Sequence, residues 1–297
     1  MPHTQQPTMR RVLRREIAGT IGLLADEHDF TAMRRYRTFT FDDHTTYLRQ
    51  VEALLRTLSA QGSHTTVALF DPEEYAEFCA ETGLEPDTPA SRTRYTAELA
   101  ATGPSVPYEG QPFDELVPDL VDEAVRQATW QYAATLLAGI GACASCGEDI
   151  GRAAFTHATE LLTRILDAVG PGEHHLVCTV SAASQPLTAA LRSEGPGAPW
   201  RTDDTGTLEL TTVLAVGLAT QSAGGLVMRT SGSGTTDRVY GWKLRGDGLV
   251  PLTAGEVFDA YCTDSASGDL VSPESGVDYC APPSIDDQGP TKGGHTH

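Results

Sequence analysis

The apolar pattern of this chain changes character once, at Gly170-Pro171-Gly172, and this change constrains the fold more than any other feature. Before it, apolar residues recur mostly every three to four positions, which predicts amphipathic helices. After it, short apolar runs separated by turn residues predict strands. We therefore expect an α+β fold with a helical N-terminal half, which contains one βαβ unit, and a C-terminal sheet that is mostly antiparallel.

The βαβ unit is predicted from two runs of β-forming residues. Residues 36–41 (YRTFTF) alternate in character, and residues 65–70 (TTVALF) form the continuous apolar run that is typical of a buried strand. Between them, an apolar stripe at helical spacing follows Asp42-Asp43 and ends at Gly62. Short connections of this kind predict two parallel strands.

The remaining elements follow from periodicity and from helix capping signals. Asp71-Pro72-Glu73-Glu74 is a strong helix start, because aspartate caps well and proline suits the first helical position. Helices are expected over residues 10–24, 71–82, 91–101, 114–139, 148–169 and 253–262. Strands are expected over residues 175–180, 208–216, 225–230, 238–244 and 249–252.

The length of 297 residues allows one large domain or two ordinary ones. We expect a single α+β domain over residues 10–263, and the alternative is two domains divided near residue 170. The ends, residues 1–9 and 264–297, are polar or rich in serine, glycine and proline. They contain too little apolar surface to offset the loss of chain entropy on folding, so we expect both to be disordered.

The formal net charge of −19 is unevenly distributed. Residues 1–56 hold nine basic and seven acidic side chains, a balance of +2, whereas the remainder holds 12 and 33, a balance of −21. Such a chain repels a phosphate backbone, so general nucleic-acid binding is disfavoured. A short arginine run within residues 10–15 is more typical of a solvated helix face than of a binding site.

Lysine is nearly missing from the chain. Lys243 and Lys292 stand against nineteen arginines, a bias that suggests a GC-rich, bacterial coding sequence. The spacing GxxxxGK[ST] does not occur, so P-loop nucleotide binding is excluded. A lysine Schiff base is disfavoured for the same reason.

The N-terminal fifteen residues are polar and contain arginines but no apolar core, so we expect no secretory signal. Without export, the six cysteines are expected to be reduced thiols in the cytoplasm. The two most apolar stretches, residues 132–146 and 213–228, are shorter than the roughly 20 residues that span a bilayer. We therefore expect no transmembrane helix.

Three carboxylates are the first candidate site. Asp42 and Asp43 follow the first predicted strand, and Asp71 follows the second. Parallel strands end at the same edge of a sheet, where open α/β sheets bind ligands, so the three could together hold Mg²⁺ through oxygen atoms. The competing interpretation is that each aspartate only caps a helix.

The second candidate site is the sequence Cys143-Ala-Ser-Cys146-Gly. A CxxC followed by glycine is half of a typical zinc knuckle, and the remaining ligands would come from His157, His174, His175 or Cys178. His174 and Cys178 lie four residues apart and therefore share one face of a strand. A redox pair is a third possibility, and burial as small apolar residues is the ordinary fate of unpaired cysteines. His157 lies on the apolar stripe of its helix, which favours a hydrogen-bonded core histidine.

These patterns favour a cytoplasmic protein that binds a protein partner or regulates one, without catalysis. The alternative is a metal-assisted hydrolase or transferase that uses Asp42, Asp43 and Asp71 with magnesium. The third hypothesis is a protein with a structural zinc site at Cys143 and Cys146. The identity of the partner or substrate and the oligomeric state do not follow from the sequence.

Overall fold

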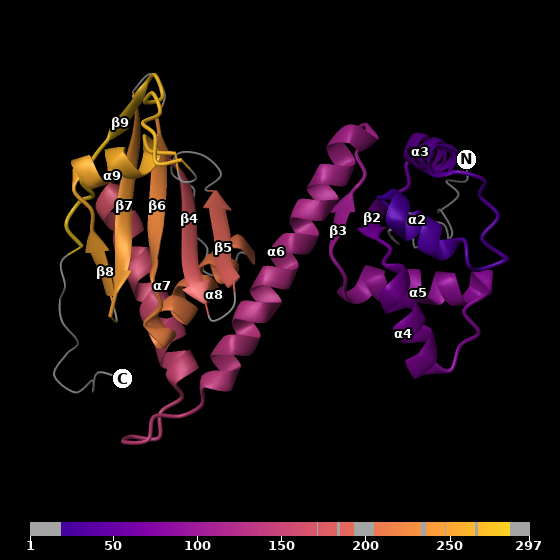
Figure 1. Cartoon of the computed structure of the whole chain (residues 1–297), viewed down its shortest axis with the longest axis horizontal. Coiled ribbons are helices and arrows are strands. Elements are labelled where there is room, and N and C mark those ends of the chain that lie inside the picture. The colour runs from indigo at the N-terminus through magenta and orange to yellow at the C-terminus, as the bar shows by residue number, and fades with distance from the viewer. Residues whose placement is uncertain are drawn as a thin grey trace, which may run out of the picture. The chain divides into compact units, whose positions relative to one another are not determined.

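The chain forms two separate compact units. The computed structural model describes residues 19–170, 172–182, 185–192, 205–232, 236–246, 248–264 and 267–285. These residues contain eight helices and nine strands in two sheets, an α+β fold as the sequence predicts (Figure 1). Unit 1 is residues 1–127 and unit 2 is residues 128–297. The boundary therefore falls inside helix α6 (Phe113–Ile140) and not near residue 170, where the sequence suggested a subdivision.

The sheet of unit 1 contains a parallel strand pair, as predicted, but the first strand of this pair is not the predicted one. Its strands are, in spatial order, β1 (Gly19–Leu23), β2 (Thr65–Leu69) and β3 (Ser105–Pro107). Strands β1 and β2 are parallel, with Ile21 opposite Val67, and β3 pairs with β2 in the antiparallel direction. The first strand of the βαβ unit is thus β1, in the segment expected to be helical.

The prediction of a strand over residues 36–41 is wrong, because these residues form turns and irregular backbone. Their alternating aromatic residues enter the core of unit 1 from this loop. The Phe41 ring lies 5.0 Å from Phe39 and 5.0 Å from Tyr47, measured between ring centroids. The alternation therefore reflects packing of a loop on a helix, and not the two faces of a sheet.

The helices of unit 1 begin at capping residues that the sequence largely reveals. They are α2 (Glu27–Met33), α3 (His44–Ala60), α4 (Pro72–Thr82), α5 (Pro89–Thr102) and the first part of α6. Pro72 stands in the first turn of α4, and Gly83 ends that helix with a φ of 66°, a conformation that glycine adopts at low cost. Helix α5 packs against β1 and β2, and α3 packs against β2 (Figure 1).

Unit 2 is built on an antiparallel sheet, as predicted. Its strands are, in spatial order, β5 (Gln185–Arg192), β4 (Glu173–Ala182), β6 (Gly224–Ser231), β7 (Asp237–Arg245) and β8 (Gly248–Pro251). A further strand, β9 (Val277–Tyr279), pairs with β7 in the parallel direction and lies inside the tail that was expected to be disordered. Residues 1–9 and 286–297 lie outside the described residues.

Helix α8 (Thr205–Thr220) is the largest departure from the sequence prediction, which placed a strand over residues 208–216. The helix lies between the sheet and α7 (Ile150–Val169), and it is buried on all sides from Thr207 to Leu218 (Figure 1). A helix buried all round has no polar stripe, so its apolar run cannot be distinguished from that of a buried strand. The helix predicted over residues 253–262 is observed as α9 (Ala254–Tyr261), and a capping box of Thr253 and Glu256 opens it.

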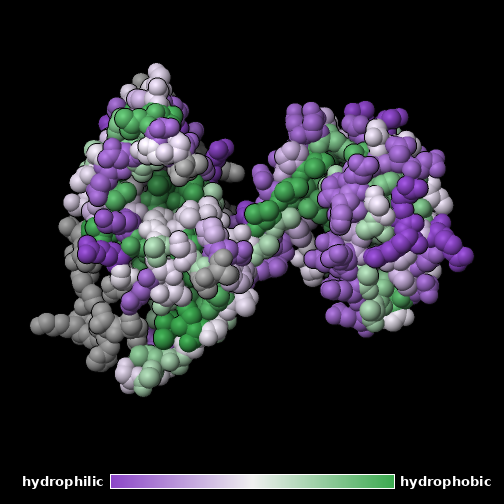
Figure 2. Space-filling view, in the orientation of Figure 1, coloured by the Kyte–Doolittle hydropathy of each residue, from purple (hydrophilic) through white to green (hydrophobic). Residues whose placement is uncertain are grey.

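The surfaces of the two units differ. Figure 2 shows mostly hydrophilic side chains over unit 1, whereas unit 2 presents hydrophilic and hydrophobic areas side by side. Within the described part of the chain, no helix combines the length and the apolar character that crossing a membrane requires.

Candidate functional site: a groove along the open edge of β1

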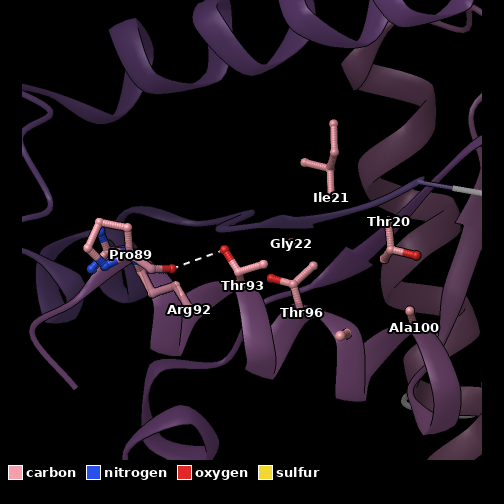
Figure 3. A pocket seen from close by; sticks show the side chains of 9 residues that line it. Thr20, Ile21, Gly22, Pro89, Arg92, Thr93, Thr96 and Ala100 are labelled. Atoms are coloured by element: carbon pink, nitrogen blue, oxygen red, sulfur yellow. Dashed lines mark hydrogen bonds between the residues drawn. The ribbon is translucent and has the colours of Figure 1, made fainter. Parts of the chain in front are cut away.

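A groove of about 570 Å³ lies in unit 1 between strand β1 and helix α5 (Figure 3). This volume falls in the range of roughly 300–1,000 Å³ that is common for ligand sites. The residues that line it are Thr20, Ile21, Gly22, Pro89, Arg92, Thr93, Thr96, Ala97 and Ala100. The groove therefore has one wall made of strand backbone and one wall made of a helix face.

The strand wall is the open edge of the sheet. Among the described strands, β1 pairs only with β2. The Gly19 N–H donates to His64 O at 3.0 Å, and Leu23 O accepts from the Phe70 N–H at 2.9 Å. Because alternate residues of a strand direct their backbone groups to opposite sides, Thr20 and the N–H of Gly22 face the groove. Figure 3 shows the Ile21 side chain pointing away from α5, so this residue contributes backbone to the groove.

The helix wall is one continuous face of α5. Its lining residues recur every three to four positions, whereas the opposite face, with Ser91, Tyr95 and Leu99, is buried in the core. Ala97 and Ala100 are exposed and add almost no side-chain volume. The core of unit 1 beneath α5 is aromatic, and the ring centroids of Tyr95 and Phe70 lie 5.0 Å apart. The groove is therefore shaped by rigid elements.

Gly22 sets the spacing between the two walls. A Cβ atom at this position would lie 2.9 Å from Phe70 Cδ2 and 3.3 Å from Thr96 Oγ1. Only glycine therefore lets β1 approach α5 and the core this closely without a shift of either. The same lack of a side chain leaves the backbone of β1 accessible from the groove.

The polar groups of the groove are hydroxyls and one cation. Thr20 Oγ1 lies 2.8 Å from Thr66 Oγ1, and Thr93 Oγ1 donates to Pro89 O at 3.0 Å. The Arg92 guanidinium donates to Thr38 Oγ1 at 2.9 Å and to Thr38 O at 3.2 Å. No described carboxylate forms an ion pair with Arg92, so its positive charge remains to attract an anionic group at one end of the groove.

A second group of polar residues lies where β1 and β2 end. Asp26 caps α2 by accepting from the Asp29 N–H at 2.8 Å, and Asp71 caps α4 by accepting from Glu73 and Glu74. One ligand atom from each of Asp26, His28 and Asp29 lies within 4.8 Å of the others. Burial and the neighbouring charges of Asp26 and Asp71 raise the pKa of Asp29, because its ionised form is disfavoured there.

The three carboxylates named from the sequence do not converge. Asp43 caps α3 by accepting from the Thr46 N–H at 2.8 Å, and this bond holds its pKa below the ordinary value. Asp71 also caps a helix, whereas Asp42 is an exposed loop residue. The capping interpretation is therefore confirmed for Asp43 and Asp71. Asp71 does lie at the carboxyl edge of the parallel strands, but its neighbours there are Asp26 and Asp29.

The thiol and imidazole candidates are also dispersed. His174 Nδ1 lies 3.0 Å from Thr230 Oγ1 and its Nε2 lies 2.9 Å from Gly170 O, which makes it a hydrogen-bonded core residue. Cys178 shares the inward face of β4 with His174, as the spacing predicts, and burial raises the pKa of its thiol to about 12. His157 is half-buried on α7. In the described residues, Cys143, Cys146, His157, His174 and Cys178 do not supply three ligand atoms to one point.

The sequence did contain a signal for the residues that were missed. The run from Ile21 to Ala25 is apolar apart from one glycine and is followed by Asp26, just as Val67 to Phe70 is followed by Asp71. In both cases a strand with apolar residues is followed by a helix-capping aspartate. The groove along α5 had no such signal, because threonine and alanine at helical spacing are unremarkable in a helix.

Residues 8–111, about a third of the chain, match the protein family described as Domain of unknown function (DUF8829). The matched segment covers most of unit 1, including both walls of the groove. No curated protein and no solved structure matches this chain.

Proposed function

We propose that this protein is an interaction protein that binds an extended segment of a partner protein in the groove between β1 and α5. The open backbone edge of β1 carries this proposal. A segment laid beside β1 gains main-chain hydrogen bonds from Thr20 and from the Gly22 N–H, which is strand addition to an exposed sheet edge, while Gly22 O already accepts from the Tyr47 hydroxyl at 3.5 Å. The small side chains of Ala97 and Ala100 leave room for the residues of that segment.

The chemistry of the walls defines the partner segment. Arg92 favours an acidic residue or a terminal carboxylate at one end of the bound segment. The threonine hydroxyls favour polar side chains along the middle. An exposed edge strand can pair with a strand of another chain and so cause aggregation. A bound partner segment would occupy the edge of β1 and prevent this.

We place this activity in the cytoplasm of a bacterium. All six cysteines lie in the described part of the chain and none of them forms a disulfide, which suits a reducing compartment. The excess of arginine over lysine favours the bacterial origin. The net charge of −19 makes a protein partner more suitable than a nucleic acid.

The test is selection of random linear peptides displayed on phage against the full chain, followed by binding measurements on the enriched peptide. We expect an extended peptide with an acidic residue near one end. Replacing Ala97 with tryptophan fills the groove and is expected to weaken binding at least tenfold, a loss of about 1.4 kcal/mol. On peptide binding, the amides of Thr20 and Gly22 are expected to exchange hydrogen more slowly.

The matched control is Ala101→Trp, which places the same side chain on the exposed surface of α5 beside the groove. It should melt like the wild type and bind the peptide with unchanged affinity. If no peptide is enriched, or if Ala97→Trp and Ala101→Trp bind equally well, the groove is not a peptide site.

A second candidate function is binding of a divalent cation at Asp26, His28 and Asp29. The observation that favours it is the convergence of their three ligand atoms, together with burial and the repulsion from Asp26 and Asp71, which raise the pKa of Asp29. Carboxylate oxygens suit Mg²⁺, and a cation would relieve this repulsion. The metal-assisted hydrolase or transferase hypothesis, which the sequence based on Asp42, Asp43 and Asp71, would then use Asp26, His28 and Asp29 as the metal ligands, with Asp71 as their neighbour.

A magnesium titration followed by thermal unfolding tests this candidate. At about 100 times its dissociation constant, a bound ion stabilises the fold by roughly 2.7 kcal/mol. Asp29→Asn is expected to abolish this gain and to raise the stability of the magnesium-free protein, because it removes a charge that is disfavoured in the folded state. Asp43→Asn, at the cap of another helix, should leave the magnesium response intact. An unchanged melting temperature of the wild type with added Mg²⁺ would exclude the site.

A further inference from the structure

The loop between α6 and α7 carries two cysteines outside the hydrophobic core of unit 2. It projects beyond the ends of the two helices (Figure 1). The loop is closed by an antiparallel bridge between Ala142 and Asp149, and the Cys143 N–H donates to Glu148 O at 2.8 Å. These bonds give the short connection a defined hairpin shape.

Inside this hairpin, the backbone makes one tight turn from Cys143 to Gly147. The Gly147 N–H donates to Cys143 O at 2.8 Å. This bond joins residues four apart, as in one turn of an α-helix. Gly147 ends the turn with a φ of 76°, a conformation that favours glycine. In one helical turn, side chains three residues apart are neighbours, with Cβ atoms about 5–6 Å apart. Cys143 and Cys146 lie three residues apart in this turn, so we infer that both thiols can reach one ion.

This pair lies outside the buried core, unlike three of the other four cysteines. Cys146 is exposed and Cys143 is half-buried, whereas Cys79, Cys178 and Cys262 are buried. Packing as small apolar residues thus explains the buried cysteines but not this pair. A glycine held in the left-handed conformation directly after the second cysteine is the geometry that aims two thiolates at one ion.

The described residues provide only these two thiolates at the loop. Among all described residues, the one group of three potential metal ligands is Asp26, His28 and Asp29, which lies in unit 1 and not at this loop. His174 and Cys178 are engaged in the core of the sheet. A zinc ion in a structural site takes four ligands in tetrahedral geometry, so two more must come from outside this loop.

The geometry points to a zinc site at the tip of this loop that is shared by two copies of the chain, each supplying Cys143 and Cys146. If a two-fold symmetry axis passes through the zinc ion, two copies of the chain each contribute one CxxC loop. The ion is then bound by four thiolates at about 2.3 Å. The loop projects from its unit, so its tip is available to a second copy. Binding releases the thiol protons to solvent and oxidises nothing. The inference does not depend on the groove in unit 1.

The experiment uses the full chain with a thiol-free reductant. After saturation with Zn²⁺ and removal of the excess, metal analysis is expected to give about one zinc per two chains. Light scattering should show a dimer that a chelator converts to monomers. Replacing zinc with Co²⁺ should produce strong thiolate-to-cobalt charge-transfer absorption. One zinc per monomeric chain, or no bound zinc, would overturn the shared site.

Single replacements locate the ligands. Cys143→Ser and Cys146→Ser are each expected to weaken zinc binding at least tenfold and to abolish the zinc-dependent dimer, without altering the fold, because neither residue is buried. Cys280→Ser is the matched control, since this half-buried thiol belongs to unit 2 but lies on another segment. A zinc-dependent dimer that survives Cys146→Ser would contradict the proposal.

Discussion

Replacing Leu214 with alanine is expected to lower the free energy of unfolding of unit 2 by about 2–5 kcal/mol. Leu214 is fully buried in α8, the helix between the sheet and α7. The smaller side chain leaves a cavity in the centre of this core, and neighbouring residues can close it only in part. For a unit of this size, each kcal/mol corresponds to a fall in melting temperature of about 2–4 °C.

Tryptophan fluorescence in urea measures this effect selectively. The three tryptophans of the chain, Trp130, Trp200 and Trp242, all belong to unit 2. The control is Leu270→Ala, which makes the same chemical change in the same unit at a side chain that is 83% exposed. It is expected to change stability by less than about 0.5 kcal/mol. Equal effects of the two replacements would mean that α8 is not the centre of the core.

Raising the pH above 10 is expected to destabilise unit 1 through its buried tyrosines. Burial raises the pKa of Tyr47 from 10.0 to about 12, and burial likewise raises the pKa values of Tyr75 and Tyr95. Because ionisation is easier in the unfolded chain, this stabilisation is complete below pH 10 and is lost as the pH rises through 12. For Tyr47 alone, the shift corresponds to about 3 kcal/mol.

The measurement is unfolding in urea at several alkaline pH values, followed by far-ultraviolet circular dichroism, with tyrosinate absorbance as the second signal. The control is Tyr47→Phe, which removes the ionisable group and the hydrogen bond from the Leu24 N–H at 3.1 Å. This variant is expected to be less stable at neutral pH by about 0.5–1.5 kcal/mol but to lose less stability on alkalinisation. If the stability of Tyr47→Phe falls with pH as steeply as that of the wild type, groups other than Tyr47 cause the alkaline loss of stability.

Much of the fold could be predicted wherever local signals were unambiguous. The helix begun by Asp71 and Pro72 and ended by Gly83 has the predicted bounds to within a residue, because capping depends on neighbours in the chain. The hairpin strands β6 to β8 also lie where alternation and turn residues placed them. The errors at residues 19–23, 36–41 and 208–216 concern segments whose pattern is decided by what packs against them.

The candidate site was less predictable than the fold. The sequence named Asp71, which does lie at the carboxyl edge of the parallel strands, but it placed the first strand too late and so missed Asp26 and Asp29. The CxxC sequence does form a tight turn, in which Cys146 is exposed and Cys143 is half-buried. The groove between β1 and α5 could not be predicted, because its two walls lie 67 or more residues apart in the chain, counted from Gly22 to Pro89.

The sequence by itself determined the α+β class, the caps of several helices and the hairpin strands β6 to β8. Each depends on chemistry between residues close in the chain, where side-chain type and spacing suffice. Only the tertiary structure decided that α8 is a helix, that the units divide within α6, and that the edge of β1 is open beside α5. These features depend on which surfaces pack together, and a continuous apolar run or a stripe of small residues is compatible with several such arrangements.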